Sequence, residues 1–367
     1  MTFFLLLACA RPPVSLSRGA EPALIAQRPG EALPTLGPDA RVDLGLRGAA
    51  EELASVATNI DARLTPGAVR LALARAGYPG DAQFFRFVGG TTISPDVLAE
   101  IPHGEPVDVG WAFRDFGDGR RWWVLGWARR RGTIDPVPRG VRLGSGTGVR
   151  VDGLDSPTLF VGTPDGGVTE MSATAGTTRW LGSLYAPGEY RVEIVEADRV
   201  AYLFSLFVGV TPSPMAPLPT PVPVENPLTA ADALYADVAR LRASLHLPVL
   251  TRFEAYEAPS REHAACIALT GILSHATASC PGVPDVAGRD FFPRAKHHED
   301  LAVAPTAAEA WDVILASPGH RRNLLCTDCT HIAVGAALEP AVSPRLFFAI
   351  ETLEFPDGTP QPIRKWR

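Results

Sequence analysis

Residues 317–325 read Ser-Pro-Gly-His-Arg-Arg-Asn-Leu-Leu. A helix is predicted just before them over 306–316, with a threonine N-cap and a glutamate three residues later at the capping-box position. Two β-like runs follow them, at 331–338 and 345–354. Helix and strand signals alternate around this stretch, which predicts an α+β domain over residues 228–356.

Two further helices are predicted upstream of this stretch. The run 230–241 is amphipathic, and the run 260–274 is rich in alanine. Before both of them, residues 211–227 contain seven prolines among seventeen positions. Proline lacks the N–H that a helix or a sheet ladder needs, so this density predicts an extended linker and a domain boundary.

The N-terminal half of the chain has a different sequence pattern. Residues 105–210 hold short β-rich runs, many of them separated by Gly, Pro and Asp, and the run 190–195 alternates as a half-buried strand does. This pattern predicts an antiparallel β-sandwich. Residues 45–104 are expected to form a small helical region, 10–44 a flexible tether rich in Pro, Ala and Gly, and 357–367 a tail. The predicted fold class is therefore multidomain.

The charge and hydropathy of the chain limit the kinds of partner that it can bind. Its 34 Lys and Arg stand against 40 Asp and Glu, a net charge of −6. Such a balance argues against a dedicated nucleic-acid binder, which must neutralise many phosphates. No apolar run approaches the ~20 residues of a membrane-spanning helix. Membrane contact is therefore expected only through a lipid anchor.

A lipid anchor is suggested by the first nine residues. An apolar core at 3–8 leads into Leu-Leu-Ala-Cys, which resembles a bacterial lipobox and implies cleavage before Cys9 and its lipidation. The alternative is a frayed N-terminus with an incidental cysteine. We expect an exported protein, either a membrane-anchored lipoprotein or an extracellular one.

The other four cysteines support export. They form an even set inside one short window, which predicts two disulfides with three possible connectivities among Cys266, Cys280, Cys326 and Cys329. The Cys-x-x-Cys spacing at 326–329 is also that of half a zinc site or of a redox motif. The sequence holds no second Cys-x-x-Cys and no thioredoxin-like strand and helix around this one.

Histidines are concentrated in the same part of the chain. Seven of the eight fall between residues 246 and 331, and neutral imidazole is the commonest metal ligand. No His-x-x-x-His pair occurs, so any site must be assembled from distant segments. Considered singly, His263 is expected on a helix surface, His297 and His298 in an exposed loop where they could extend a metal site, and His331 at a strand start.

Four motifs, taken in order, resemble a known family. Gly-Ile-Leu-Ser-His at 271–275 is followed by Glu-Asp-Leu-Ala at 299–302, by the stretch 317–325, and by Ile-Ala-Val-Gly-Ala-Ala at 332–337. Their order and spacing resemble the bacterial branch of the CAP superfamily, which includes cysteine-rich secretory proteins, antigen 5 and plant pathogenesis-related proteins. The resemblance covers about residues 228–355 and implies an α-β-α sandwich with a central cleft.

The resemblance also implies a set of cleft residues. His275 matches the first histidine of the family, Glu299 its motif acid and His320 its second histidine, so His275 and His320 are expected to bind a metal, with zinc as the expected ion. A carboxylate such as Glu299 would orient an imidazole or a bound water. The family's second acid has no clear match, and Asp312 is only a substitute for it.

Three functions follow as alternatives. The leading one is an exported envelope protein whose CAP-like domain binds a divalent metal, a small or lipidic ligand, or an envelope polymer, without catalysis. The second is a metal-dependent hydrolase, with Glu299 as general base for a water held at His275 and His320. The third is adhesion through the β-sandwich, with the CAP-like domain as scaffold.

Overall fold

The computed structural model of the chain describes residues 36–117, 119–174, 176–196, 199–283, 296–341 and 344–355. Cys9, most of the expected tether and the expected tail lie outside these residues. The chain divides into two compact units. Unit 1 comprises Met1–Ile60 with Ala68–Pro217, and unit 2 comprises Asp61–Gly67 with Leu218–Arg367. The change at Pro217 falls inside the proline-rich stretch.

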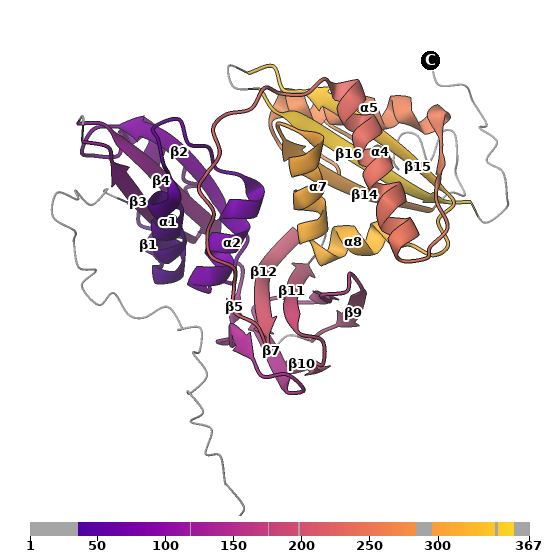
Figure 1. The fold of residues 1–367 in the computed structure, drawn as a ribbon, viewed down its shortest axis with the longest axis horizontal. Helices are drawn as coiled ribbons and strands as arrows, with labels where there is room; N and C mark the ends of the chain where they lie inside the picture. Colours follow the sequence, from indigo (N-terminus) through magenta and orange to yellow (C-terminus); the bar gives the residue numbers. More distant parts are fainter. Residues whose placement is uncertain are drawn as a thin grey trace, which may run out of the picture. The chain divides into compact units, whose positions relative to one another are not determined.

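Unit 1 begins with a four-stranded sheet in the order β1-β3-β4-β2. Its strands are β1 (Ala40–Val42), β2 (Gln83–Gly89), β3 (Val107–Asp115) and β4 (Arg121–Arg129). Its helices are α1 (Leu44–Val56), α2 (Pro66–Ala76) and the short α3 (Pro95–Leu98). Helix α1 lies against this sheet (Figure 1). It packs so closely on β3 that a Cβ added at Gly110 would overlap the backbone of Leu46 and Arg47.

This sheet corrects the expected domain boundary at residues 104 and 105. Strand β2, from the expected helical region, pairs along β4, from the expected sandwich, and β1, from the expected tether, pairs with β3. The tryptophans of β3 and β4 explain the arrangement, because Trp111, Trp122 and Trp123 are fully buried. Such a nearly continuous apolar run suits a strand covered on both faces.

The rest of unit 1 is the β-sandwich, which occupies a shorter span than expected. Its two sheets have the orders β10-β7-β5 and β6-β12-β11-β8-β9. Their inner faces share one core, in which Val149 of β7 and Val192 of β11 are buried. The strands are β5 (Thr133–Ile134), β6 (Gly140–Val141), β7 (Gly146–Asp152), β8 (Thr158–Gly162), β9 (Val168–Ser172), β10 (Thr178–Ser183), β11 (Gly188–Glu196) and β12 (Arg199–Val208).

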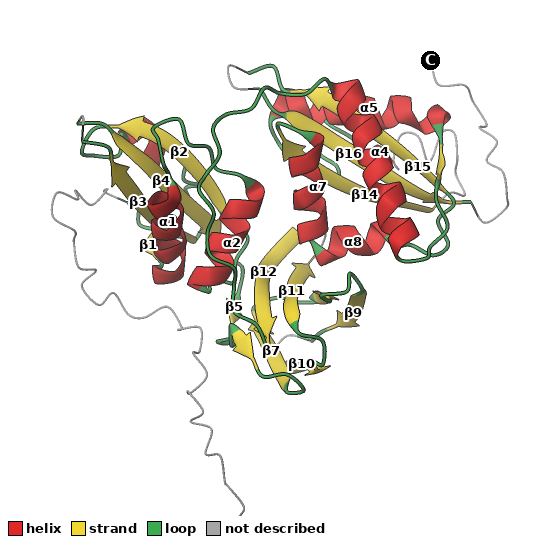
Figure 2. Ribbon diagram, viewed as in Figure 1, coloured by secondary structure: helices red, strands yellow, loops and turns green. Residues whose placement is uncertain are grey.

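Unit 2 has a sheet in the order β13-β15-β16-β14, with helices on both faces (Figure 2). Its strands are β13 (Thr251–Arg252), β14 (Lys296–Ala304), β15 (His331–Leu338) and β16 (Leu346–Glu354). Its helices are α4 (Pro227–Ser244), α5 (Glu254–Thr270), α7 (Ala307–Ala316) and α8 (Pro318–Leu324). Among the residues that the structure describes, no helix is both long and apolar enough to cross a membrane.

Two cores lie on the two faces of this sheet. Phe347 packs in the core beneath α5, and its neighbour Phe348 packs in the core beneath α4 and α7. Neighbouring side chains of a strand point to opposite faces, so β16 contributes to both cores. The layers are helix, sheet and helix, as the resemblance implied.

Two helix boundaries differ from expectation. Helix α4 begins at Pro227, because the Asn226 side chain accepts from Leu228 N–H at 2.9 Å and caps it. Helix α5 begins at Glu254, not 260, and ends at Thr270, followed by Gly271, whose positive φ of 67° suits a glycine cap. His275 therefore stands beyond the helix, in the following turn.

Four of the cysteines are paired within unit 2. Cys266 bonds to Cys280, and Cys326 bonds to Cys329. This is one of the three connectivities that the sequence left open.

Residues 61–67 belong to unit 2 although the chain on either side belongs to unit 1. Arg63 donates two hydrogen bonds of 2.6 Å to the Glu309 carboxylate on α7, and its N–H donates to Pro219 at 2.8 Å. The Thr306 hydroxyl accepts from Glu309 N–H at 3.2 Å, which is the N-cap bond expected there. The glutamate carboxylate itself bonds to Arg63.

Candidate functional site

Strand β14 places polar side chains on both faces of the sheet. His297 bonds to the buried Tyr256 of α5, with 2.8 Å between its Nδ1 and the phenol oxygen. Asp300 accepts from the Asn323 amide of α8 at 2.8 Å. Residues 297 and 299 therefore face α5, and residues 298 and 300 face α8 and the loop after it, as alternation along a strand requires.

On the α5 face, the Glu299 carboxylate lies between two imidazoles. Its Oε1 is 2.7 Å from His275 Nδ1, and its Oε2 is 3.5 Å from His263 Nε2. The glutamate side chain is only 5% exposed, whereas the His275 side chain is 44% exposed. Glu299 is thus an internal anchor for a histidine that reaches the surface.

A second carboxylate lies beside the first. Glu351 of β16 is directly opposite Glu299 in the strand register and is fully buried. Burial and the charges of Glu299 and Asp300 raise the pKa of Glu351 well above its ordinary value. Burial also raises the pKa of Glu299, but hydrogen bonding to His275 and Glu351 and the charge of His263 lower it overall. These opposite shifts favour a proton on Glu351 and a negative charge on Glu299.

His320, on α8, is the third predicted residue. Burial, and then the nearby charge of His275, lower the pKa of His320 to about 4, so its imidazole is neutral at neutral pH. Its Nδ1 is buried and has no hydrogen-bond partner among the residues that the structure describes. A neutral imidazole with an unsatisfied nitrogen is suited to bind a ligand.

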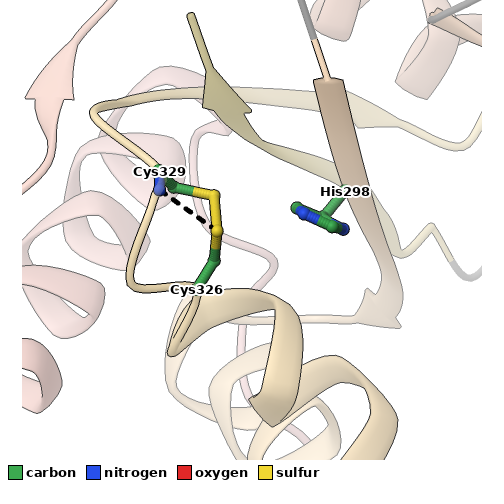
Figure 3. A group of neighbouring side chains, drawn as sticks. All are labelled: His298, Cys326 and Cys329. Carbon is green, nitrogen blue, oxygen red and sulfur yellow. Dashed lines mark hydrogen bonds between the residues drawn. A yellow bond between two sulfur atoms is a disulfide. The ribbon is translucent and has the colours of Figure 1, made fainter. Parts of the chain in front are cut away.

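The three predicted residues are thus brought into one neighbourhood, but not around one point. His275 and Glu299 are in contact, and His320 is close enough for the charge of His275 to act on it. Within the described part of the chain, the His, Cys, Asp and Glu group whose ligand atoms all lie within 4.8 Å is His298, Cys326 and Cys329 (Figure 3).

Sequence reasoning missed two members of the site. His263 was expected at a helix surface, but it is 4% exposed, because α5 packs this face on the sheet. Glu351 was not considered, although a charged residue inside the apolar run at 346–353 is a visible signal. It provides the buried second acid, whereas the substitute considered for that role, Asp312, is exposed on α7.

The neighbouring histidines also differ from expectation. His297 and His298 belong to β14 and are half-buried, not in an exposed loop. His331 begins β15, as expected, and its ring packs edge-on against Phe253 and Phe355.

The proton on Glu351 makes stability depend on pH. A folded-state pKa above the ordinary 4.5 means that its stabilising contribution is full below about pH 4.5 and is lost as pH rises through the folded pKa. Glu351→Gln keeps the neutral form at every pH. We expect the unfolding free energy of the variant to rise relative to that of the wild type as pH increases through the folded pKa of Glu351.

The measurement is the free energy of unfolding across that pH range. Glu339→Gln is the matched control, because Arg345 lowers the pKa of Glu339 and any loss there falls below about pH 4.5. Parallel curves for the wild type and Glu351→Gln would show that Glu351 is ionised in the folded protein.

Several solved structures are similar to parts of this chain. No family model matches the chain, and no curated protein matches it. An outer surface protein of Borrelia burgdorferi is similar over 34% of this chain and 92% of its own, with 20% identity and a TM-score of 0.30. An extracellular SCP-domain protein of Bacillus anthracis is similar over 61% and 67%, with 15% identity and a TM-score of 0.30.

A cysteine-rich secretory protein of Staphylococcus aureus is similar over 47% of this chain and 58% of its own, with 15% identity and a TM-score of 0.27. The order of the motifs in unit 2 and its helix, sheet and helix layers resemble the CAP superfamily. The two disulfides of unit 2 fit an exported protein.

Proposed function

We propose that this is an exported binding protein whose CAP-like unit holds a divalent metal ion, or a small polar or lipidic ligand, against His275 and His320. The observation that carries the proposal is the 2.7 Å contact between His275 Nδ1 and Glu299 Oε1. An ionised carboxylate only accepts, so His275 donates from Nδ1, and Nε2 is the ring nitrogen left to face a ligand. This arrangement is that of a metal-binding histidine held by a carboxylate.

The donor atoms suit zinc, the expected ion. His275 offers Nε2, and His320 is neutral with a buried nitrogen that lacks a hydrogen-bond partner among the described residues. Glu299 is too buried to be more than an orienting group. When bound, zinc supplies an open Lewis-acid position for a polar ligand. The residues of the chain hold and orient it.

Burial favours binding over the hydrolase alternative. Glu299 was expected as the general base, but a carboxylate that is 5% exposed and bonded to His275 lacks direct access to a substrate water. Its proton-bearing neighbour Glu351 is fully buried. A hydrolase would have to use His275 itself as the base. Lipid anchoring at Cys9 and adhesion through the β-sandwich stay separate predictions.

The test is zinc binding by the oxidised full-length chain, measured by equilibrium dialysis and metal analysis. We expect about one equivalent, lost in His275→Ala and His320→Ala and weakened ~10–100-fold in Glu299→Gln, which removes the orienting charge. His103→Ala, an exposed histidine of unit 1, is the control. No zinc in the wild type, or equal zinc in the His275→Ala/His320→Ala double variant, would refute metal binding and turn attention to lipids and envelope polymers.

A further inference from the structure

A second cluster of metal-ligating side chains lies on the other face of β14. His298 points from that strand toward the loop that follows α8, where Cys326 and Cys329 lie (Figure 3). One ligand atom from each of the three residues lies within 4.8 Å of the other two. Because His298 and Glu299 are neighbours on one strand, this cluster is separated by the sheet from the His275–Glu299 pair.

The loop that carries the cysteines is held independently of its disulfide. The guanidinium of Arg242 is fully buried and donates from Nη1 to the carbonyls of Leu324 at 2.8 Å and Cys326 at 2.9 Å. Its Nε donates to Pro248 at 2.7 Å. These bonds do not involve sulfur, so we expect the loop to keep its place when the sulfur–sulfur bond opens.

The surroundings also favour negative charge on sulfur. Cys329 N–H donates to Cys326 Sγ at 3.1 Å, a bond that strengthens when the sulfur is a thiolate. Arg242 brings a buried positive charge to the same loop, and its Nη2 has no hydrogen-bond partner among the described residues. A nearby cation and a backbone donor both stabilise a thiolate.

We propose that reduction of the disulfide between Cys326 and Cys329 opens a site for a thiophilic divalent ion of the zinc class, held by both sulfurs and one ring nitrogen of His298. Two residues between the cysteines is the usual spacing of a zinc-binding pair. Tetrahedral zinc needs donor atoms about 3.5–3.8 Å apart. The two sulfurs, about 2 Å apart while they are bonded, must therefore separate by about 1.7 Å after reduction, and the ring nitrogen of His298, which lies within 4.8 Å of them, needs a shift of about an ångström. The fourth position is left to water or an external ligand.

The reaction balances in two steps. An external dithiol reductant supplies two electrons and two protons, breaks the sulfur–sulfur bond, and itself becomes a disulfide. The ion then replaces the two thiol protons, which are released to solvent. Cys326 and Cys329 are therefore a disulfide under oxidising conditions and, together with His298, a metal site under reducing ones.

The experiment uses the full-length chain with Cys266→Ala/Cys280→Ala, so that the remaining disulfide of unit 2 is the one tested. The protein is reduced, the reductant is removed without oxygen, and cobalt(II) is titrated in. We expect a thiolate-to-cobalt charge-transfer band in the near ultraviolet, saturating at about one equivalent and abolished by zinc. The oxidised protein should show no such band.

Three variants decide the outcome. Adding Cys326→Ser/Cys329→Ser should abolish the band, and adding His298→Gln should weaken cobalt binding at least tenfold. Adding His275→Ala/His320→Ala should leave the band intact, which separates this site from the proposed function. The proposal is overturned if reduced protein gives no band, if the band survives Cys326→Ser/Cys329→Ser, or if circular dichroism shows that reduction unfolds the chain.

Discussion

Arg242→Met is expected to lower the free energy of unfolding of unit 2 by about 3 kcal/mol or more. The arginine is fully buried and donates to three backbone carbonyls, those of Pro248, Leu324 and Cys326. Methionine fills much of the volume but donates to none of them. Each buried acceptor left without a partner costs about 1–3 kcal/mol, and removal of the arginine desolvation penalty offsets part of this sum.

The measurement is chemical denaturation combined with hydrogen exchange in α4 and α8, which reports on unit 2 separately from unit 1. Arg240→Met is the matched control, because this arginine lies on the same helix, is 70% exposed and pairs with Asp237. Its loss should cost less than about 1 kcal/mol. Equal effects of the two substitutions would mean that the buried hydrogen bonds contribute little.

Gly335→Val is expected to be at least as damaging. A Cβ at this position of β15 would overlap the backbone of Ser260 and Arg261 in α5. Overpacking a core costs about 1–3 kcal/mol when side chains can adjust, and more when the obstacle is backbone. We expect a loss above about 3 kcal/mol, with α5 lifted from the sheet and His263 displaced from Glu299.

Two readouts test the glycine prediction. The free energy of unfolding measures the loss of stability. Zinc binding by any folded fraction shows whether the His275 site depends on how α5 packs on the sheet. Gly140→Ala is the control, because a Cβ there meets nothing within 4 Å. A Gly335→Val protein as stable as the wild type would show that α5 can move away from β15 at little cost.

The order of the motifs was enough to predict the site residues that belong to the motifs themselves. His275 and Glu299, which two of the motifs supply, are in contact. Glu351 was missed because its place beside Glu299 depends on the pairing of β14 with β16, which are far apart in the sequence. Register between distant strands is set by tertiary packing, and local patterns carry little information about it.

The helix and sheet boundaries also depend on tertiary packing that local sequence patterns do not reveal. Helix α5 begins six residues before its predicted start, and His263 was therefore misjudged as a surface residue. In unit 1, the turn signals after residue 105 were visible, but the pairing of β2 with β4 joins segments that look separate along the chain. The disulfide connectivity is instead the most local of the three, with separations of 14 and 3 residues, and the count of cysteines alone could not select it.

Residues 61–67 have a consequence for how the protein can be divided. Because they complete unit 2 from within the first part of the chain, a gene fragment that starts at the proline-rich stretch encodes that unit without Arg63 and leaves Glu309 without this counter-charge. A protease that cuts the same stretch would leave the seven-residue piece covalently joined to unit 1. The two units are therefore not separable modules, and evolution could exchange, duplicate or discard the complete C-terminal unit only together with part of its neighbour.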